Sequence, residues 1–261
     1  MPELPDLEIF KSNIMKRLSS KRLTGLNVFN SAKALFSESS LREELCGREL
    51  LDVDRVGKEL YFDFGGGRVV SAHLMLNGKM EIVPREAVSS INYKIFSFDF
   101  ENESLVFSDM GSLCTIKYQP SPDKAPDAFG PAFTLDYFLS AAHKKPRTNV
   151  KAFLIDQNIV KGIGNAYADE ILWEARISPC SLVGKIPADA LAALYNAIGA
   201  VLRNAVESIR QICPDIISGE ERGFLKVHNK KLKSTETGHR IVIEKIASKT
   251  TYYTDEQVLY L

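Results

Sequence analysis

Apolar positions at the start of the chain recur with helical spacing. Four apolar residues of the segment DLEIFKSNIMKRL lie three or four positions apart: Leu7, Phe10, Ile14 and Leu18. This spacing predicts an amphipathic helix that begins close behind Glu3. From about residue 23 to residue 117 the pattern changes to short alternating or apolar runs, such as YFDF, RVVSAHLML and IFSFDF, separated by glycine-rich breaks. These runs predict a β-sandwich of antiparallel strands.

The second half of the chain has mainly helical periodicity. Residues 119–131, QPSPDKAPDAFGP, hold four of the eleven prolines and no periodic pattern, which predicts a linker between two domains. Beyond it, VKAFLIDQ and NAYADEILWEA predict two helices joined by a glycine-containing turn, and ADALAALYNAIGAVLRNAVESIRQIC predicts a long one. The apolar stripe expected on the long helix is Leu191, Leu194, Ile198, Leu202, Ala205 and Ile209. The last 38 residues return to strand-like runs, FLKVH, RIVIEK and TTYY, with a turn expected at Thr237–Gly238.

Composition excludes several classes of protein. The 261 residues contain no apolar run long enough for a membrane span, and acidic Glu3, Asp6 and Glu8 occupy the positions where a signal peptide carries positive charge. A reducing, cytoplasmic or nucleoid-associated location is therefore expected, or a nuclear one in a eukaryote. The four cysteines form no Cys-x-x-Cys pair, which argues against a zinc ribbon or a disulfide framework. No metal site and no cofactor are predicted.

Charge is balanced in total but not along the chain. The 33 basic residues equal the 33 acidic ones, which by itself does not favour a polyanionic partner. Residues 140–165 and residues 220–250 nevertheless each carry a net charge of +4, whereas residues 81–136 carry −5. This distribution indicates one basic and one acidic face, although a solvated mixed surface is the alternative.

The first candidate chemistry lies at the N-terminus, in the sequence Pro2-Glu3-Leu4-Pro5. Once the initiator Met1 is removed, Pro2 has a free secondary amine, and such an amine condenses with an aldehyde-level carbon to give a cationic iminium. The carboxyl group of Glu3 could then move protons on and off the substrate. While Met1 is retained, the nitrogen of Pro2 is an amide without a usable lone pair, so we expect such protein to bind its target without cleaving it.

Two further constellations carry candidate chemistry. Lys58 follows Gly57 in VGKEL at the head of a strand, and a neighbouring ammonium would lower the pKa of the Pro2 amine. The string DQNIVKGIGNAYADEIL predicts two helices joined by a double turn, with Asn165 at the N-cap of the second. A helix N-terminus with free amide donors is suited to bind phosphate.

Taken together, these motifs resemble the formamidopyrimidine-DNA glycosylase and endonuclease VIII family of base-excision repair enzymes. The resemblance extends over nearly the whole chain: PELP, Gly57-Lys58, His73 followed by Gly78, FGP at residues 129–131, the DQNIVKGIGNAYADEIL motif and FLKVHNK at residues 224–230. It implies an α+β fold with four parts: an N-terminal catalytic β-sandwich with a leading helix (1–118), a linker (119–131), a helix–two-turn–helix DNA-binding domain (132–223) and a C-terminal β-hairpin (224–261).

The resemblance also implies a reaction and the residues that perform it. The expected activity is that of a bifunctional DNA glycosylase and abasic-site lyase that removes oxidised bases, with Pro2 as Schiff-base nucleophile, Glu3 as general acid/base and Lys58 as an electrostatic and phosphate-side helper. The DNA-binding residues that it implies are Asn165, Lys249, His73, Leu76, Lys151, Gly164 and Tyr167. Damaged double-stranded DNA is the expected partner, and a monomer is the expected state. A catalytically silent relative that only recognises damaged DNA is the alternative.

The sequence departs from the family pattern in three respects. Residues 224–261 contain no cysteine, so the hairpin resembles the "zincless finger" of some relatives, and Lys249 stands where the finger arginine is expected. Guanine-directed members fill the space left by the flipped base with a Met, an Arg and a Phe. Here Leu76 could act as an apolar wedge, but the Arg and the Phe have no counterparts in residues 109–113, and the loop after Cys213 is short. We therefore expect ring-opened purines, hydantoins or oxidised pyrimidines to be preferred over 8-oxoguanine.

Overall fold

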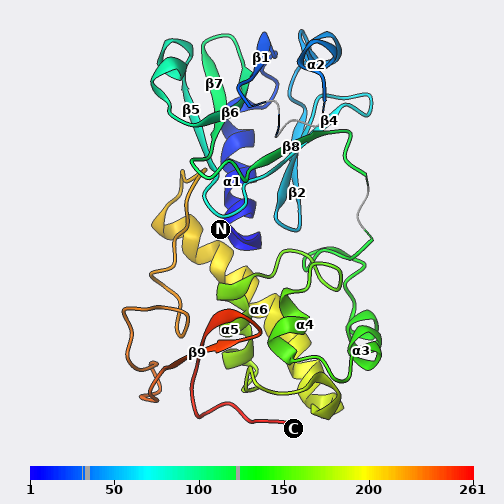
Figure 1. Cartoon of the computed structure of the whole chain (residues 1–261), viewed down its shortest axis with the longest axis vertical. Helices are drawn as coiled ribbons and strands as arrows, with labels where there is room; N and C mark the ends of the chain where they lie inside the picture. Colours follow the sequence, from blue (N-terminus) through cyan, green and yellow to red (C-terminus); the bar gives the residue numbers. More distant parts are fainter. Residues whose placement is uncertain (31, 33–35, 122–123) are drawn as a thin grey trace. The chain divides into compact units, whose positions relative to one another are not determined.

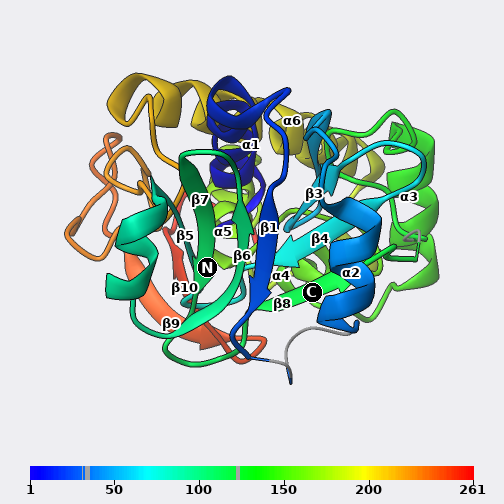
Figure 2. The same ribbon diagram turned by 90° about the horizontal axis from the view of Figure 1, so that it is seen from above.

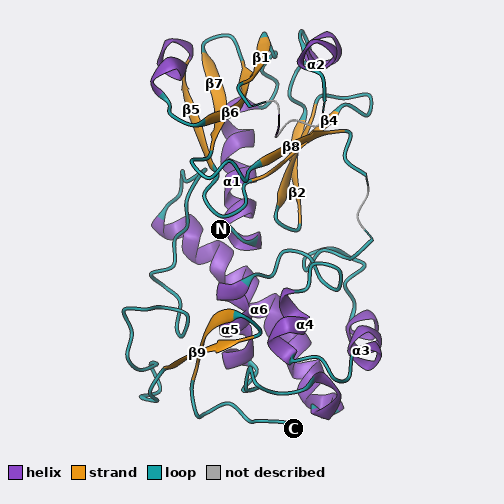
Figure 3. Ribbon diagram, in the orientation of Figure 1, coloured by secondary structure: helices purple, strands orange, loops and turns teal. Residues whose placement is uncertain are grey.

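The computed structural model describes residues 1–30, 32, 36–121 and 124–261, which form two compact units. Unit 1 comprises Met1–Pro122 and Arg210–Glu220, and unit 2 comprises Asp123–Ile209 and Glu221–Leu261. Nearly all strands belong to unit 1, whereas unit 2 is helical apart from one hairpin (Figure 3). The fold is α+β, as the sequence predicted.

Unit 1 contains two four-stranded antiparallel sheets, one with the order β1-β6-β7-β5 and one with the order β2-β3-β4-β8. The strands are β1 (Gly25–Val28), β2 (Asp52–Val56), β3 (Glu59–Asp63), β4 (Val69–His73), β5 (Lys79–Pro84), β6 (Lys94–Asp99), β7 (Glu103–Ser108) and β8 (Thr115–Tyr118). Apolar side chains of both sheets meet in one core, where the ring of Phe62 lies 5.3 Å from that of Phe98 and 5.8 Å from that of Phe107. The predicted β-sandwich is therefore confirmed.

The leading helix is α1 (Leu4–Leu18), which packs against the strands of unit 1 (Figure 1). Its predicted stripe is buried throughout, so the amphipathic pattern gave the correct face. Glu3 is the N-cap, and its backbone N–H donates to Asp6 Oδ2 at 2.8 Å in a reciprocal capping box.

Within the described residues of unit 1, two named helical segments lie where the sequence pattern predicted only strands. They are α2 (Glu38–Leu45) and the 3₁₀ turn η2 (Arg85–Ser90), and Figure 2 shows α2 close to β1. The segment ESSLREEL buries only Leu41 and Leu45, so its apolar signal was too sparse to predict a helix.

The end of the long helix belongs to unit 1, whereas residues 132–223 were predicted to form one domain. Ile216 and Ile217 pack against the core of unit 1, and the side-chain amide of Asn13 donates to the carbonyl of Ile216 at 2.8 Å. These long-range contacts anchor residues 210–220 to unit 1. A domain boundary that is predicted from local composition cannot take such contacts into account. The division after Pro122 lies within the linker that was predicted at residues 119–131.

Unit 2 has four helices within the described residues: α3 (Leu135–Lys144), α4 (Val150–Ile155), α5 (Asn165–Glu174) and α6 (Ala188–Ile212). A short 3₁₀ turn, η3 (Val183–Lys185), precedes α6. All six residues of the stripe predicted for α6 are buried. The helix–two-turn–helix arrangement is formed by α4 and α5.

The C-terminal hairpin consists of β9 (Val242–Ile246) and β10 (Lys249–Tyr253), paired from Ile246↔Lys249 to Val242↔Tyr253. Its two-residue turn is Ala247–Ser248, with φ of +51° and +62°. Non-glycine residues pay roughly 1–2 kcal/mol each for this left-handed conformation. The predicted strand FLKVH is wrong, because residues 224–228 form turns and bends instead.

Candidate active site and nucleic-acid interface

Pro2 is buried and lines a cavity of about 780 Å³ that lies wholly within unit 1. Leu76 and Glu220 line the same cavity, and the ammonium group of Met1 pairs with the carboxylate of Glu220. Glu3 is only 4% exposed and begins α1. The two N-terminal residues with predicted chemistry are thus held at the start of a packed helix, next to a cavity that a substrate could enter.

Lys58 lies in the two-residue turn between β2 and β3, where Gly57 adopts φ +62°. The guanidinium group of Arg55 fastens this turn to α1. It donates to the carbonyl of Gly57 at 3.0 Å and to Glu8 Oε1 at 2.6 Å, and the side chain of Arg55 is only 2% exposed. A buried, charge-assisted contact of this kind fixes the turn that carries Lys58 relative to the helix behind Pro2.

His73 ends β4, and its Nδ1 accepts a hydrogen bond from the N–H of Met75 at 2.9 Å. Burial lowers the pKa of His73; Glu59 opposes this shift, whereas Lys58 adds to it. The ring is therefore neutral near pH 7, with Nδ1 as acceptor and the proton on Nε2. A neutral donor at this position can hydrogen-bond a phosphate oxygen.

Leu76 stands at the tip of the loop between β4 and β5 and is 59% exposed. The loop is tight, because Gly78 donates its N–H to the carbonyl of Leu74 at 2.9 Å and has no room for a Cβ there. An exposed leucine on a tight loop is compatible with the predicted wedge.

Asn165 is the first residue of α5, and Gly164 is the N-cap. The sequence prediction that Asn165 is the N-cap is therefore off by one residue, since the carbonyl of Gly164 already accepts the N–H of Ala168 at 3.0 Å. The side-chain nitrogen of Asn165 donates to the carbonyl of Thr250 in β10 at 2.9 Å. Because an amide nitrogen carries two hydrogens, a second donor remains for a phosphate oxygen.

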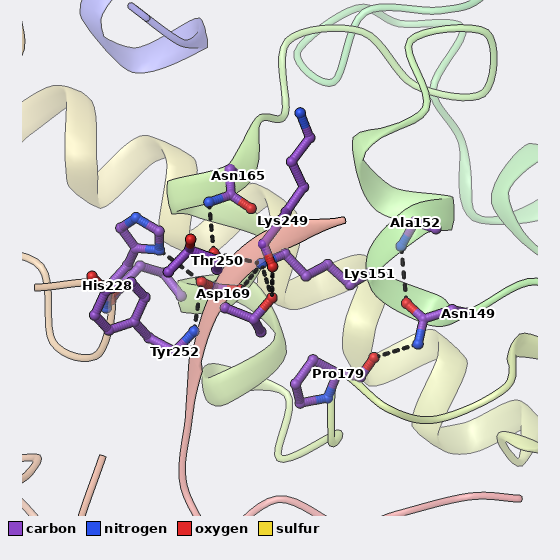
Figure 4. A network of polar contacts seen from close by, with 12 residues as sticks. Asn149, Lys151, Ala152, Asn165, Asp169, Pro179, His228, Lys249, Thr250 and Tyr252 are labelled. Carbon is purple, nitrogen blue, oxygen red and sulfur yellow. Dashed lines mark hydrogen bonds and ion pairs between the residues drawn. The ribbon is translucent and has the colours of Figure 1, made fainter. Parts of the chain in front are cut away.

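A buried polar network joins α4, α5 and the hairpin (Figure 4). Lys151 Nζ lies 2.7 Å from Asp169 Oδ1 and 2.6 Å from Thr251 Oγ1. The other carboxylate oxygen of Asp169 is 2.6 Å from His228 Nδ1 and accepts the backbone N–H of Tyr252 at 3.0 Å. Asp169 therefore connects three segments that are far apart in the sequence.

This network corrects part of the predicted DNA interface. The side chains of Lys151 and Tyr167 have no exposed surface, so neither is available to DNA in this structure. Gly164 is buried and has no side chain, so its predicted contact with DNA stays a prediction that concerns its backbone. Lys151 compensates a buried carboxylate instead, because an unpaired charge in the interior is costly. The hydroxyl of Tyr167 accepts from Arg222 at 3.3 Å, and the guanidinium group lies 5.0 Å from the centre of its ring.

Glu170 is a structural residue that the sequence reasoning missed. Its carboxylate accepts the backbone N–H groups of Lys226, Val227 and His228 at 3.0, 2.8 and 2.7 Å. Burial raises the pKa of Glu170, and the hydrogen bonds from His228 and Val227 oppose that shift. These bonds explain why FLKVH is not a strand, since its amides bind a side chain rather than a neighbouring strand. The adjacent acids in the otherwise apolar NAYADEIL were the available signal.

Lys249 is exposed and begins β10 directly after the strained turn. Its side chain extends away from the Lys151–Asp169 pair (Figure 4). Asn165 donates to the carbonyl of Thr250, the residue that follows Lys249. Asn165 and Lys249, the two predicted phosphate-binding residues of unit 2, therefore lie side by side.

No group of three or more His, Cys, Asp or Glu residues suited to a metal ion occurs in the described part of the chain. None of the helices formed by the described residues is long and apolar enough to cross a membrane. Whether the activity is independent of metal stays a prediction.

Two family models match the chain. The formamidopyrimidine-DNA glycosylase N-terminal domain matches residues 1–116, and the formamidopyrimidine-DNA glycosylase H2TH domain matches residues 125–213. The chain is similar to a formamidopyrimidine-DNA glycosylase of Carboxydothermus hydrogenoformans, with 29% identity over 97% of this chain and 98% of the relative. It is also similar to that of Lactobacillus delbrueckii subsp. bulgaricus, with 30% identity over 79% and 78%.

A solved structure of the formamidopyrimidine-DNA glycosylase of Lactococcus lactis, in complex with DNA that contains an abasic site, has the same fold. Its TM-score is 0.86 at 23% identity, and the alignment covers 98% of this chain and 99% of that one.

Proposed function

The chain belongs to the formamidopyrimidine-DNA glycosylase family, and from that premise we propose that its chemistry proceeds through the N-terminal amine of Pro2 after removal of Met1. The protein is a base-excision repair enzyme, a DNA glycosylase with abasic-site lyase activity, and damaged DNA is its partner. The observation that carries the proposed role of Pro2 is its position at the start of α1, in the wall of a cavity large enough for a nucleotide.

The reaction that this geometry supports begins with attack of the Pro2 nitrogen on C1′ of the damaged nucleotide. The base leaves with a proton, and the opened sugar remains bound to Pro2 as an iminium. The positive nitrogen then draws electrons from the C2′–H bond, so that C2′ loses a proton and the C3′–O bond to the phosphate breaks. Glu3 is the proposed proton carrier, since it follows Pro2 directly in the chain.

Three residues are proposed to hold the phosphates on either side of the lesion. They are Asn165 and Lys249 in unit 2 and His73 in unit 1. Support comes from the remaining donor of Asn165, the exposed ammonium of Lys249 and the neutral donor of His73. Phosphate contacts fix the register of the DNA, whereas contacts to the base determine which lesion is removed. We further propose that the enzyme acts on the chromosome as a monomer.

Ring-opened purines and oxidised pyrimidines are the proposed substrates, with 8-oxoguanine processed more slowly. The support is the absence of the Arg and Phe wedge from residues 109–113 and the short segment after Cys213. Single-turnover rates on matched duplexes test this preference, and a higher rate on 8-oxoguanine than on a thymine glycol or hydantoin duplex would contradict it.

Pro2, Glu3 and Lys58 are all retained, which argues against the catalytically silent DNA-binding relative that the sequence left as an alternative. Borohydride trapping on abasic-site DNA tests the proposed role of Pro2. Protein that begins at Pro2 should form a covalent adduct that maps to the N-terminal peptide. Protein that retains Met1, identified by intact mass, should bind the same DNA without an adduct. An adduct on a lysine, or equal trapping of both forms, would overturn the assignment.

A further inference from the structure

Three large apolar side chains are exposed around the cavity that Pro2 lines. Leu76 is 59% exposed, Tyr93 63% and Met110 72%, and all three line this one cavity. Exposed apolar side chains gathered around a cavity mark a binding surface, because each of them would otherwise be more stable in the core. Only Leu76 among them was predicted to contact DNA.

Tyr93 is held in a strained backbone conformation at this cavity. Its φ is +55°, in the left-handed region, where a bulky residue is uncommon and costs about 1–3 kcal/mol. Within the described part of the chain, neither its ring nor its hydroxyl makes a hydrogen bond or ring contact that could offset this cost. Strain that the fold itself does not use is typical of a functional site.

The fold nevertheless fixes the position of Tyr93. It directly precedes β6, and its carbonyl accepts the N–H of Asp109 at 2.9 Å. The carboxylate of Asp109, which is 2% exposed, accepts the N–H groups of Leu113 and Cys114 at 2.6 and 2.8 Å. The backbone of Tyr93 is thus anchored to the loop that also carries Met110, so the point from which the exposed ring extends is fixed beside the cavity.

We propose that Tyr93 is a specificity-determining residue whose ring stacks on the flipped damaged base. This inference rests on the proposed function, because a base enters the cavity only when the sugar next to it reaches Pro2. Stacking on an aromatic side chain tolerates any base with a π-face. Among the proposed substrates it therefore favours bases that keep a planar ring, such as a formamidopyrimidine, over saturated pyrimidines, which are puckered. The slower processing proposed for 8-oxoguanine, which is also planar, rests on the missing Arg and Phe and not on stacking.

Two variants of Tyr93 distinguish the contribution of the aromatic ring from that of the hydroxyl group. Tyr93→Leu removes the π-face and keeps an apolar side chain on the same strained backbone, whereas Tyr93→Phe keeps the ring. Phe29→Leu is the matched control, because Phe29 is a 42% exposed aromatic residue of unit 1 that does not line the cavity. Thermal unfolding of all three variants establishes that they fold.

Single-turnover cleavage is measured on duplexes with a formamidopyrimidine, a dihydropyrimidine or a preformed abasic site. Tyr93→Leu should lower the single-turnover rate constant on the formamidopyrimidine about tenfold more than on the abasic site, which has no base to stack. It should also reduce the ratio of the rate constants on the formamidopyrimidine and the dihydropyrimidine. Tyr93→Phe should restore both quantities, and Phe29→Leu should change neither.

Three outcomes would overturn the stacking role. An equal loss of rate on abasic DNA would mean that Tyr93 holds the duplex instead of the base. The other two are a Tyr93→Phe variant as slow as Tyr93→Leu, and a Tyr93→Leu variant that loses no rate at all. Wild-type protein that begins at Pro2 is trapped on abasic DNA in parallel. If it is trapped while Tyr93→Leu behaves normally, only this inference fails; if it is not trapped, the proposed function fails.

Discussion

Lys151 and Asp169 form an ion pair in which neither side chain has any exposed surface, with 2.7 Å between Nζ and Oδ1. Both charges are removed from water, which costs desolvation free energy, and only the attraction between the two charges offsets that cost. The pair lies beneath β10, where Thr251 accepts from the same ammonium group and Tyr252 donates to the same carboxylate. A hairpin without cysteine is thereby held against α5 by charge.

Lys151→Met should therefore lower the free energy of unfolding by about 3–5 kcal/mol, because it leaves the carboxylate of Asp169 buried without its countercharge. Urea unfolding measures this change. The double variant Lys151→Met/Asp169→Asn removes both charges and keeps an oxygen that can accept from Tyr252, so it should recover part of the loss. A single variant within about 1 kcal/mol of wild type would show that the pair does not stabilise the protein.

Glu256 gives the C-terminal segment a pH-dependent stability. Burial opposes its ionisation, but hydrogen bonds from Thr237, Trp173 and Thr254 outweigh that effect and lower its pKa from 4.5 to about 2. A carboxyl group whose pKa is lower in the folded state stabilises the protein above pH 4.5, and this contribution is lost as the pH falls towards about 2. Glu256→Gln should thus lower Tm at pH 7, and the difference from wild type should shrink below pH 4.5.

The measurement is thermal unfolding at a series of pH values, followed by tryptophan fluorescence. Trp173 is the only tryptophan in the chain, and its Nε1 donates to Glu256 at 3.2 Å, so the signal reports on this contact. A Tm difference that stays constant from pH 7 to pH 3 would contradict the assignment.

Lys249→Ala should weaken binding to damaged and undamaged duplexes by about the same factor, because a phosphate contact carries no sequence information. The slope of log affinity against log salt should fall by about one, in fluorescence anisotropy titrations at several salt concentrations. Lys245→Ala removes a charge from the other strand of the same hairpin, opposite Thr250. An equal effect of both variants would indicate general attraction rather than a specific contact.

Glu3→Gln should suppress base excision more strongly than cleavage at a preformed abasic site, since only excision requires protonation of a leaving base. General acid–base catalysis contributes about 10²–10⁴-fold, which sets the size of the expected loss. Glutamine can still accept the N–H of Asp6, so the start of α1 should persist. Rates on a lesion duplex and an abasic duplex are compared, and an equal loss on both would contradict a role in excision.

Prolonged dialysis against a chelator should leave cleavage unchanged, because the segment from residue 224 to residue 261 contains no cysteine and the hairpin is held by the Asp169 network. Activity lost on chelation and restored by zinc would show that a metal site exists. Cleavage assays with and without added zinc, together with elemental analysis, distinguish the two cases.

The sequence by itself determined those features that depend on neighbouring positions. The stripes of α1 and α6 follow from a 3.6-residue period, and the antiparallel strands of unit 1 follow from short apolar runs between turns. The motifs around Pro2, Lys58 and Asn165 identified the family for the same reason, since each is a contiguous string. Where the local signal was sparse, as in α2, the prediction was incomplete.

Only the tertiary structure decided which side chains are buried and which distant groups they contact. Lys151 looks like any basic residue of a DNA-binding segment, yet its partner Thr251 is 100 residues away and its charge is buried. FLKVH has the composition of a strand, but the carboxylate of Glu170, 56–58 residues before it, takes its amides. Burial and pairing are set by contacts between distant segments, and free energy of desolvation depends on those contacts rather than on the local pattern.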